Sequence, residues 1–265
     1  SHPDVELVAV ARKGTEQLER IRDRFGFPIA SEDYRDVIDA GIDACVVASP
    51  ATFHREHAAA ALEAGAHVMC EKPFTIDPRE AWELVEVAER SQRQLNVAFG
   101  ANYLPMVQQA KRLMEEIGIG ELEQLSIVMS STTRELLSNT GSYPQADPDA
   151  IPESATWTDP AVAGGGYGQA QLSHALGLGL WLTDARVSSA FAYMTAPLEA
   201  PVELHDAVAF RCDDGAIGVL SGGSAHLGAD AEVEFQLVVE EAIVVTEAEG
   251  KFAVGVGDGV AVGVV

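Results

Sequence analysis

The sequence has few basic residues. Its 17 Lys and Arg stand against 41 Asp and Glu in 265 residues, which gives a formal net charge of −24. A surface of this sign repels the phosphate backbone of nucleic acids and anionic membrane surfaces. We therefore expect no nucleic-acid partner and no membrane partner, and we interpret the acidity as a solvated surface that keeps the protein in solution.

Cysteine is also scarce, and its three positions are far apart: Cys45, Cys70 and Cys212. An odd number of widely spaced cysteines predicts neither a disulfide framework nor a zinc site. The sequence also has no run of about 18 apolar residues, which a membrane span needs, and no basic-then-apolar secretory signal. These absences predict a cytoplasmic protein. The 47% hydrophobic content is sufficient for a buried core.

The first hundred residues alternate between short apolar segments and segments with helical spacing. Val5–Val10 precedes a helical pattern after Gly14, Cys45–Ala48 precedes His54–Ala64, and His67–Cys70 precedes Pro78–Arg90. Asp77, Pro78 and Glu80 form an N-terminal capping pattern for the last of these helices. Because parallel strands need crossover connections, the pattern predicts a Rossmann-like, doubly wound parallel sheet of the α/β class.

A Gly-x-Gly-x-x-Gly turn is absent near the N-terminus. A Rossmann sheet uses such a turn after its first strand to hold a pyrophosphate. The segment Val5–Val10 has the character of the second strand. We therefore predict that the first strand of the sheet is missing, together with a βα unit of roughly 30 residues.

The pattern changes after an apolar strand at Leu95–Phe99. A helix at Pro105–Glu116, a strand at Glu121–Met129 and a helix near 167–183 follow, and the Ser-, Thr-, Asp- and Pro-rich loop 135–163 is expected to lie over the site. Five later segments are predicted as largely antiparallel strands: Ser188–Tyr193, Leu204–Cys212, Ile217–Leu220, Val233–Val239 and Ile243–Thr246. Residues 1–103 are thus predicted to form a truncated dinucleotide-binding domain, and residues 104–265 an α+β substrate-binding and oligomerisation domain.

One face of an open antiparallel sheet needs a cover. The alternation in Leu204–Phe210 and in Val233–Val239 supplies an apolar face, with Val208 and Phe235 expected on it. We therefore expect a homodimer or homotetramer that forms through this sheet.

Two segments carry a resemblance to a known family. Val46–His54 has the sequence VVASPATFH, and Ala64–Pro73 has the sequence AGAHVMCEKP. Together with Gly164–Gly166, His174 to Trp181 and Asp213–Leu220, they resemble the Gfo/Idh/MocA family, the glucose-fructose oxidoreductase and inositol dehydrogenase family. The resemblance covers nearly the whole chain. It implies an NAD(P)-dependent oxidoreductase that transfers a hydride between nicotinamide and a hydroxyl-bearing carbon of a sugar, polyol or related small molecule.

The Glu71-Lys72-Pro73 motif carries the strongest functional expectation. The resemblance places Lys72 beside the nicotinamide, with Glu71 and Pro73 as further cofactor contacts and with a cis bond before Pro73. A buried ammonium can polarise or protonate the reacting oxygen. The alternative is a surface lysine on a strand-to-helix turn.

His174 is the second catalytic candidate, because the resemblance assigns a proton-transferring histidine to this helix. The carboxylates that accompany this histidine in the family are replaced by Ala170 and Gly177. Gln169 and Gln171 are candidate substrate contacts beside His174, but an amide does not carry a proton as a carboxylate does. His174 therefore remains a candidate for catalysis, for substrate binding or for a structural role.

His54 and His57 have the spacing of a metal pair on a helix. No third ligand is evident nearby in the sequence, so no metal site is expected. The resemblance instead places His54 near the phosphate and ribose of the cofactor, together with Ser49, Pro50 and Thr52 in the preceding turn.

Charge after the predicted second strand bears on the choice of cofactor. An acidic residue there binds the ribose of NAD, whereas a basic residue accommodates the extra phosphate of NADP. Arg12 and Lys13 occupy this position, so NADP(H) is the preferred cofactor, with NAD(H) possible. The alternative is two exposed turn residues.

Asn102 and Tyr103 are candidate substrate contacts. They follow the strand at Leu95–Phe99, where relatives commonly carry arginine, and this difference predicts a substrate that is not strongly anionic. A second function also stays open, because the family includes non-catalytic members. The lost carboxylates and the missing Gly-rich turn favour a ligand sensor or regulator, whereas Lys72 and His174 favour catalysis.

Overall fold

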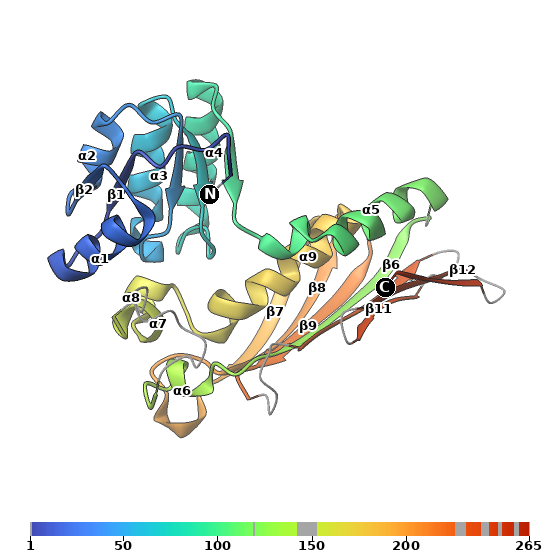
Figure 1. Cartoon of the computed structure of the whole chain (residues 1–265). Helices are drawn as coiled ribbons and strands as arrows, with labels where there is room; N and C mark the ends of the chain where they lie inside the picture. The colour runs from blue at the N-terminus through green and yellow to red at the C-terminus, as the bar shows by residue number, and fades with distance from the viewer. Residues whose placement is uncertain are drawn as a thin grey trace. The chain divides into compact units, whose positions relative to one another are not determined.

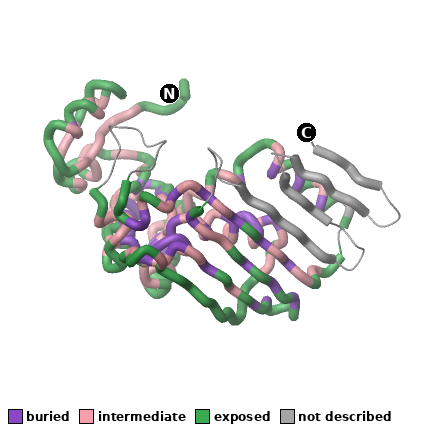
Figure 2. The backbone as a smooth tube through the Cα atoms, turned by 90° about the horizontal axis from the view of Figure 1, so that it is seen from below, coloured by how far each residue is buried: buried purple, intermediate pink, exposed green. Residues whose placement is uncertain are grey.

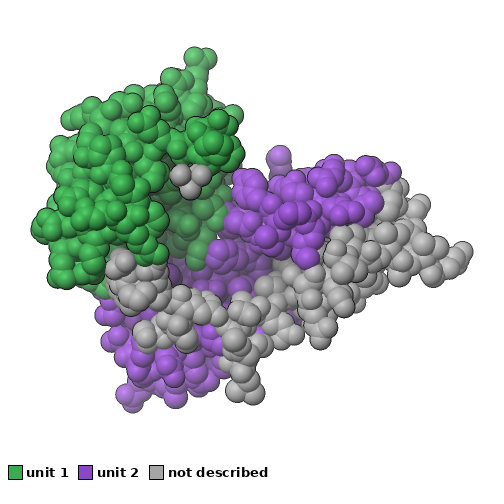
Figure 3. Space-filling model, viewed as in Figure 1, with its two compact units in different colours: residues 1–98, 144–153 green, residues 99–143, 154–265 purple. Residues whose placement is uncertain are grey.

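The computed structural model describes residues 2–118, 120–141, 153–225, 232–239, 244–248, 251–256 and 260–264, with the backbone alone beyond residue 225. The chain divides into two compact units (Figure 3): the first comprises residues 1–98 and 144–153, and the second comprises residues 99–143 and 154–265. In the described residues, no helix is long and apolar enough to cross a membrane.

The first unit alternates strands with helices, as the sequence predicts (Figure 1). Its elements are β1 (Ala9–Ala11), α1 (Thr15–Phe25), β2 (Ile29–Ser31), α2 (Tyr34–Asp39), β3 (Ala44–Val47), η1 (Ala51–Phe53), α3 (His54–Glu63), β4 (His67–Cys70), α4 (Pro78–Ser91) and β5 (Leu95–Val97). The predicted strands and helices are confirmed within a few residues, and β2 and α2 are additional. Asp77 caps α4 as predicted, since its side chain accepts a hydrogen bond from the N–H of Arg79 at 2.8 Å.

The strands of the first unit form two parallel sheets, β1–β2 and β3–β4–β5. In a Rossmann fold, the first strand lies between the second and the fourth. The division between the two sheets falls at the place of the first strand in a Rossmann sheet.

Helices α3 and α4 cover one face of the sheet β3–β4–β5. Val47, Val68 and Cys70 of this face belong to a buried cluster with the apolar side of the two helices. On the opposite face Val46 and Met69 pair in register, and their side chains are 68% and 45% exposed.

The second unit packs helices on a large sheet (Figure 1). Its helical elements are η2 (Gly100–Tyr103), α5 (Pro105–Ile117), α6 (Arg134–Leu137), α7 (Ala155–Thr158), α8 (Pro160–Ala163), the π-helical turn η3 (Gly168–Leu172) and α9 (Ser173–Thr183). Helices α5 and α9, predicted from their spacing, contribute Val107, Met114 and Leu178 to the main core. The predicted loop 135–163 contains three short helices in its described residues, and 142–152 lie outside them.

The sheet of the second unit has the order β10–β6–β9–β8–β7. Its strands are β6 (Leu122–Ser130), β7 (Val187–Thr195), β8 (His205–Cys212), β9 (Ile217–Gly223) and β10 (Glu232–Val239). All neighbours are antiparallel except β6 and β9, which are parallel. The strands β11 (Val244–Ala248), β12 (Lys251–Val256) and β13 (Val260–Val264) form a separate antiparallel sheet, and the last two of them are not predicted. The α+β class is confirmed.

The prediction that Val208 lies on the open face of this sheet is wrong. Val208 packs against the buried core, whereas Ala207 and Ala209 are exposed. Successive side chains of a strand point to opposite faces, and the buried and exposed residues alternate accordingly (Figure 2). Apolar residues stand in both sets of β8, so the sequence pattern did not identify the open face.

The other residue expected on the open face, Phe235, has a side chain outside the described residues. Its backbone pairs in register with Ile127, which is fully buried. The backbone register therefore places position 235 beside a core position of β6.

A lysine connects the two main helices of the second unit. Lys111 Nζ of α5 donates a hydrogen bond to the carbonyl oxygen of Trp181 at 2.8 Å and lies 2.6 Å from Asp184 Oδ2. Trp181 and Asp184 stand at the C-terminal end of α9, where the free carbonyl groups of a helix favour a cation. Lys111 thus fixes α5 to the end of α9.

Candidate functional site

Lys72 stands just beyond strand β4. The N–H of Glu71 donates to the carbonyl oxygen of Val47 at 2.8 Å, which continues the β3–β4 pairing by one residue, and the Lys72–Pro73 peptide bond is cis, as expected from the resemblance. Burial lowers the pKa of Lys72, and the charge of Glu71 partly opposes this shift. A lysine with a lowered pKa exchanges its proton more readily near neutral pH, as acid–base catalysis requires.

His54 connects the two segments that carry the predicted cofactor residues. Its Nε2 lies 2.6 Å from the carbonyl oxygen of Ser49, and its Nδ1 lies 3.0 Å from that of Pro73. The side chain is 1% exposed. His54 therefore joins the turn after β3 to the segment that holds Lys72, and its predicted contact with a cofactor stays a prediction.

His57 belongs to a small aromatic cluster next to the turn after β3. Its ring lies 4.2 Å from that of Tyr34 and 5.8 Å from that of Phe53, and its Nδ1 is 2.9 Å from Ser49 Oγ. Burial lowers the pKa of His57. Pro50 and Thr52 belong to the same turn and are half-buried. Among the described residues, no group of three or more His, Cys, Asp or Glu could hold a metal ion.

Arg12 and Lys13 follow β1, as predicted. The N–H of Arg12 donates to the carbonyl oxygen of Ser31 at 3.1 Å, beside the end of β2. Acidic residues stand close to this position: Glu32 accepts a hydrogen bond from Thr15 Oγ1 at 3.0 Å. The N–H of Arg35, with smaller contributions from the charges of Arg35 and Lys13, holds the pKa of Asp33 below its usual value. The Lys13 cation thus lies near the Asp33 carboxylate.

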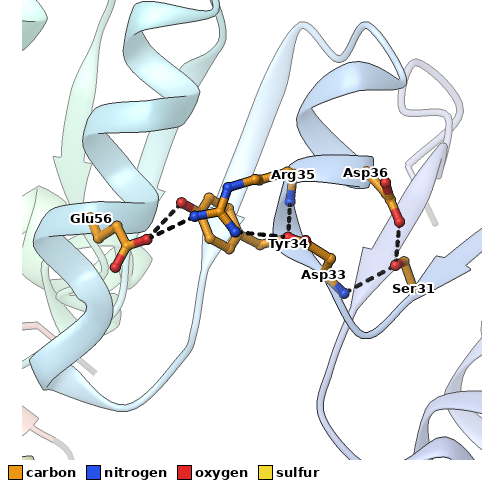
Figure 4. A network of polar contacts seen from close by, with 6 residues as sticks. All are labelled: Ser31, Asp33, Tyr34, Arg35, Asp36 and Glu56. Atoms are coloured by element: carbon orange, nitrogen blue, oxygen red, sulfur yellow. Dashed lines mark hydrogen bonds and ion pairs between the residues drawn. The ribbon is translucent and has the colours of Figure 1, made fainter.

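A polar network, which the sequence did not predict, joins β2, α2 and α3 (Figure 4). Tyr34 donates a hydrogen bond to Glu56 Oε1 at 2.8 Å, and Arg35 lies 3.5 Å from the same oxygen. Asp33 caps α2 by accepting from the N–H of Arg35 at 3.0 Å. Asp33, Tyr34 and Arg35 come directly after β2, and this position could have marked them as candidate site residues. They were missed because β2 itself was not predicted.

In the second unit, the Gly164–Gly166 run allows a close approach of two backbone segments. The N–H of Gly166 donates to Glu203 Oε1 at 2.7 Å, and the N–H of Tyr167 donates to the carbonyl oxygen of Glu203 at 2.9 Å. A Cβ atom on Gly166 would lie 2.2 Å from that carbonyl oxygen. Gly166 is therefore required by packing against Glu203.

Three predicted substrate or catalytic residues lie on one continuous helical segment. Gln169 and Gln171 belong to η3, His174 is the second residue of α9, and all three are half-buried. π-Helical turns inside helices are frequent at functional sites. Ala170 in the same turn is buried.

A side chain at position 177, where the resemblance predicts a carboxylate, would fit only tightly in this structure. An added Cβ at Gly177 would meet the ring of Phe99 at 3.0 Å. The loss of this carboxylate is thus accompanied by the packing of an aromatic ring against α9.

Asn102 and Tyr103 both belong to η2 but differ in exposure. Asn102 is buried, its Oδ1 has no hydrogen-bond partner among the described residues, and its carbonyl oxygen accepts from Gln108 Nε2 at 2.6 Å. Tyr103 is 62% exposed. Their contact with substrate stays a prediction.

A further acidic residue of the second unit was missed by the sequence analysis. Asp206 at the start of β8 is 5% exposed. Burial and then the charge of Glu203 raise the pKa of Asp206 to about 6, against the effect of the approaching Gly168 N–H. Apolar residues stand on both faces of β8, so the sequence did not show which face is buried, and the burial of Asp206 became visible only from the packed structure.

Comparisons with known proteins agree with this geometry. The sequence profile described as "Oxidoreductase family, NAD-binding Rossmann fold" matches residues 1–99, and that of the "GFO/IDH/MocA C-terminal domain" matches residues 107–245. The first unit is thus a nucleotide-binding unit of the oxidoreductase type. The chain belongs to the Gfo/Idh/MocA family.

Curated relatives match over part of their length. D-glucoside 3-dehydrogenase of Escherichia coli (strain K12) is 33% identical over 132 residues, which are 49% of this chain and 37% of that protein. Levoglucosan dehydrogenase of Pseudarthrobacter phenanthrenivorans is 36% identical over 100 residues, which are 37% of this chain and 26% of that protein. The chain therefore matches less than half the length of each of these two relatives.

Solved structures share the fold over nearly the whole chain. Levoglucosan dehydrogenase in complex with NADH and levoglucosan superposes with a TM-score of 0.79 at 22% identity, over 95% of this chain and 67% of that chain. An NAD binding oxidoreductase from Klebsiella pneumoniae superposes with a TM-score of 0.80 at 20% identity, over 99% and 72%. At these identities the similarity establishes the fold.

Proposed function

We propose that the chain belongs to an NAD(P)-dependent oxidoreductase that transfers a hydride between nicotinamide and a hydroxyl-bearing carbon of a sugar or polyol. The observation that carries the proposal is Lys72, whose pKa is lowered by burial and whose segment is held by His54 through Pro73. The names of two relatives, a glucoside dehydrogenase and a levoglucosan dehydrogenase, support a sugar-like substrate.

The residues at the carboxyl ends of the parallel strands suit a nicotinamide dinucleotide. Ser49 and Thr52 offer hydroxyl groups after β3, Arg12 and Lys13 offer cations after β1, and Lys72 follows β4. In open α/β sheets, ligands bind outside the carboxyl ends of the strands. When bound, the nicotinamide accepts or supplies the hydride.

The protein's own contribution is proton transfer and orientation. Lys72 Nζ exchanges a proton with the reacting oxygen of the substrate, which prevents a full charge from forming on that oxygen. Gln169 and Gln171 hydrogen-bond substrate hydroxyl groups, and His174 is the second proton carrier.

We propose NADP(H) as the preferred cofactor. Arg12 and Lys13 would pair with the extra phosphate, because a guanidinium and a phosphate form strong charge-assisted hydrogen bonds. Glu32 and Asp33 near this position compete for the cations, so NAD(H) binding is retained. A relative named D-xylose 1-dehydrogenase (NADP(+)), from Hypocrea jecorina, is 31% identical over 153 residues.

A fluorescence titration of the purified chain with NADPH and with NADH tests the cofactor proposal. Tighter binding of NADPH is expected, and Arg12→Ala should remove the preference. The control is Arg90→Ala, which removes a cation from the exposed face of α4. A preference for NADH, or an effect of Arg90→Ala equal to that of Arg12→Ala, would contradict it.

A second candidate function is a non-catalytic sensor that keeps the fold. Ala170 and Gly177 favour it, because they replace both carboxylates that accompany the histidine in the family, and Phe99 fills the space at Gly177. A sensor would bind nicotinamide and a sugar-like ligand without turnover. Formation of NADPH or NADH, followed by absorbance at 340 nm with a panel of sugars and polyols, separates the two functions. An enzyme forms the reduced cofactor with one of these substrates, whereas a sensor does not.

We also propose self-association through the open face of the large sheet. Phe191 and Tyr193 lie on this face, are 62% and 72% exposed, and contact each other edge to face at 4.9 Å. Ile217 and Val219 on β9 extend the apolar surface across the sheet. An exposed apolar surface of this kind is characteristic of protein–protein interfaces.

Light scattering tests this interface. Phe191→Asp is expected to reduce the mass in solution to that of one chain, whereas Trp82→Asp, at an exposed aromatic residue of α4, should leave it unchanged. Retention of a larger species by Phe191→Asp would contradict the interface.

We propose a cytoplasmic location, because the cysteines of the chain form no disulfide bonds. All three are free thiols, and Cys70 and Cys212 are buried. Burial raises the pKa of Cys70 to about 12, which keeps this thiol protonated and unreactive. Fractionation of cells that express the protein would test the location.

A further inference from the structure

The carboxyl group of Asp206 lies directly beneath the π-helical turn η3. A Cβ atom added to Gly168 would lie 3.4 Å from Asp206 Oδ1 and 3.5 Å from Oδ2, so both oxygens face the start of the turn. Asp206 is buried, and neither oxygen has a hydrogen-bond partner among the described residues. The N–H of Gly168 approaches the carboxyl group and partly offsets the rise in its pKa.

The other end of the turn rests on the neighbouring strand. Asp206 pairs in register with Gly222 of β9, and a Cβ atom on Gly222 would lie 2.5 Å from Leu172 Cδ2 and 2.9 Å from Tyr167 Cε1. Gly168 thus packs against Asp206, and Leu172 packs against Gly222. Gln169 and Gln171 lie between Gly168 and Leu172 in the turn.

We propose that Asp206 is a positioning residue that, in its protonated form, holds the turn η3 and the start of α9 against the sheet, and that its ionisation loosens this contact. The proposal deepens the proposed function, because Gln169, Gln171 and His174 are the substrate and proton-transfer residues of that function. Asp206 acts on them through the backbone of the turn and touches no reacting atom.

The surroundings of Asp206 explain why the neutral form is compatible with the packed turn. The groups that face it are the Glu203 carboxylate from the preceding segment and the Tyr167 phenol from the turn, whereas its partner in β9 is a glycine. The Tyr167 hydroxyl donates to the carbonyl oxygen of Met129 at 3.2 Å. A buried carboxylate that has no cation beside it and only the Gly168 N–H as a nearby donor is costly, so ionisation favours states in which the turn opens to water.

The sign of the pH dependence follows from linkage. The pKa of Asp206 is raised in the folded state to about 6, from 3.8 when exposed. The packed turn is therefore favoured at low pH and disfavoured as the pH rises. With these two values, the equilibrium for opening the turn increases about tenfold between pH 5 and pH 8.

Hydrogen exchange of the chain without cofactor or substrate tests this inference. After correction for the intrinsic pH dependence of exchange, the amides of residues 168–173 in the wild type should lose about tenfold in protection between pH 5 and pH 8. Asp206→Asn, which stays neutral, should show equal protection at both pH values. Glu203→Gln, at the neighbouring half-buried carboxylate, is the control and should keep most of the wild-type dependence.

Two results would overturn the inference: an identical pH dependence in wild type and Asp206→Asn, or a change spread equally over the turn and the core strand β6. The second result would mean that Asp206 affects global stability alone. If Asp206→Asn does not fold, Gly168→Ala is the second variant: its Cβ would come into van der Waals contact with both carboxyl oxygens and shield them from water, which should lower protection in the turn most at high pH. The measurement needs no turnover, so its failure is distinguishable from failure of the proposed function.

Discussion

The ring of Phe99 lies 3.0 Å from the position that a Cβ atom of residue 177 would occupy on α9. The ring therefore opposes a carboxylate side chain at position 177, where the resemblance predicts one. Gly177→Asp should lower the free energy of unfolding by about 2–4 kcal/mol, because the side chain overpacks the site and buries a carboxylate against an aromatic ring.

Urea denaturation measures this effect. The control is Gly100→Asp, since no atom lies within 4 Å of a Cβ added there. Equal stability of the two variants would show that α9 and Phe99 are not packed as described.

The glycine run before η3 allows a sharper comparison between two neighbours. Gly166→Ala places a Cβ atom 2.2 Å from the Glu203 carbonyl oxygen, whereas Gly165→Ala meets Glu203 Oε1 at 3.3 Å, an atom of a flexible side chain. Gly166→Ala should therefore lower the free energy of unfolding by about 3 kcal/mol or more, and Gly165→Ala by about 1 kcal/mol or less. Thermal unfolding of both variants is the measurement, and a reversed order would contradict the geometry.

The Lys111 connection should contribute measurably to stability. Lys111→Met keeps the apolar part of the side chain but removes the hydrogen bond to Trp181 and the ion pair with Asp184. We expect a loss of about 1–2 kcal/mol, most of it from the carbonyl group that loses its donor. Asp184 is 81% exposed, so Asp184→Ala should cost no more than about 0.5 kcal/mol. A double-mutant cycle in urea would separate the two contributions, and equal losses in both single variants would speak against this division.

The lowered pKa of Lys72 predicts the pH dependence of alcohol oxidation. Oxidation requires a group that accepts the hydroxyl proton, so the neutral amine is the active form. Burial lowers the pKa of Lys72 below 10.5, so kcat/KM should rise with pH and level off below the range of an ordinary lysine. A pH–rate profile measures this. A profile with no rise on the alkaline side, or one unchanged in Lys72→Arg, would exclude Lys72 as the proton acceptor.

The elements that the sequence predicted well carry strong local signals. Helix α4 begins with an Asp77 cap and Pro78, and β3 and β4 are continuous apolar segments followed by helical spacing. The Glu71-Lys72-Pro73 motif predicted the cis bond before Pro73 through a resemblance. These features depend on neighbouring residues in the chain, which the sequence shows directly.

The features that were missed depend on contacts between distant segments. The three-residue strand β2 is too short for a periodic pattern, and Val208 alternates with residues that are equally apolar. Asp206 has the sequence context of an exposed residue, and its burial arises from Gly168 and Gly222, which are remote in the chain. Glycine is likewise required at position 166 because the backbone of Glu203, which is distant in the sequence, packs against it.

The turnover of Lys72→Met tests the proposed role of Lys72 in the nicotinamide-dependent oxidation of a hydroxyl group. Reduction of NADP(+) or NAD(+) is followed at 340 nm with a panel of sugars and polyols, with Arg90→Met as the control. We expect turnover by the wild type, a loss of at least about 100-fold in Lys72→Met, and unchanged turnover and cofactor affinity in Arg90→Met. Equal turnover by Lys72→Met and the wild type, or cofactor binding by the wild type without any turnover, would contradict it.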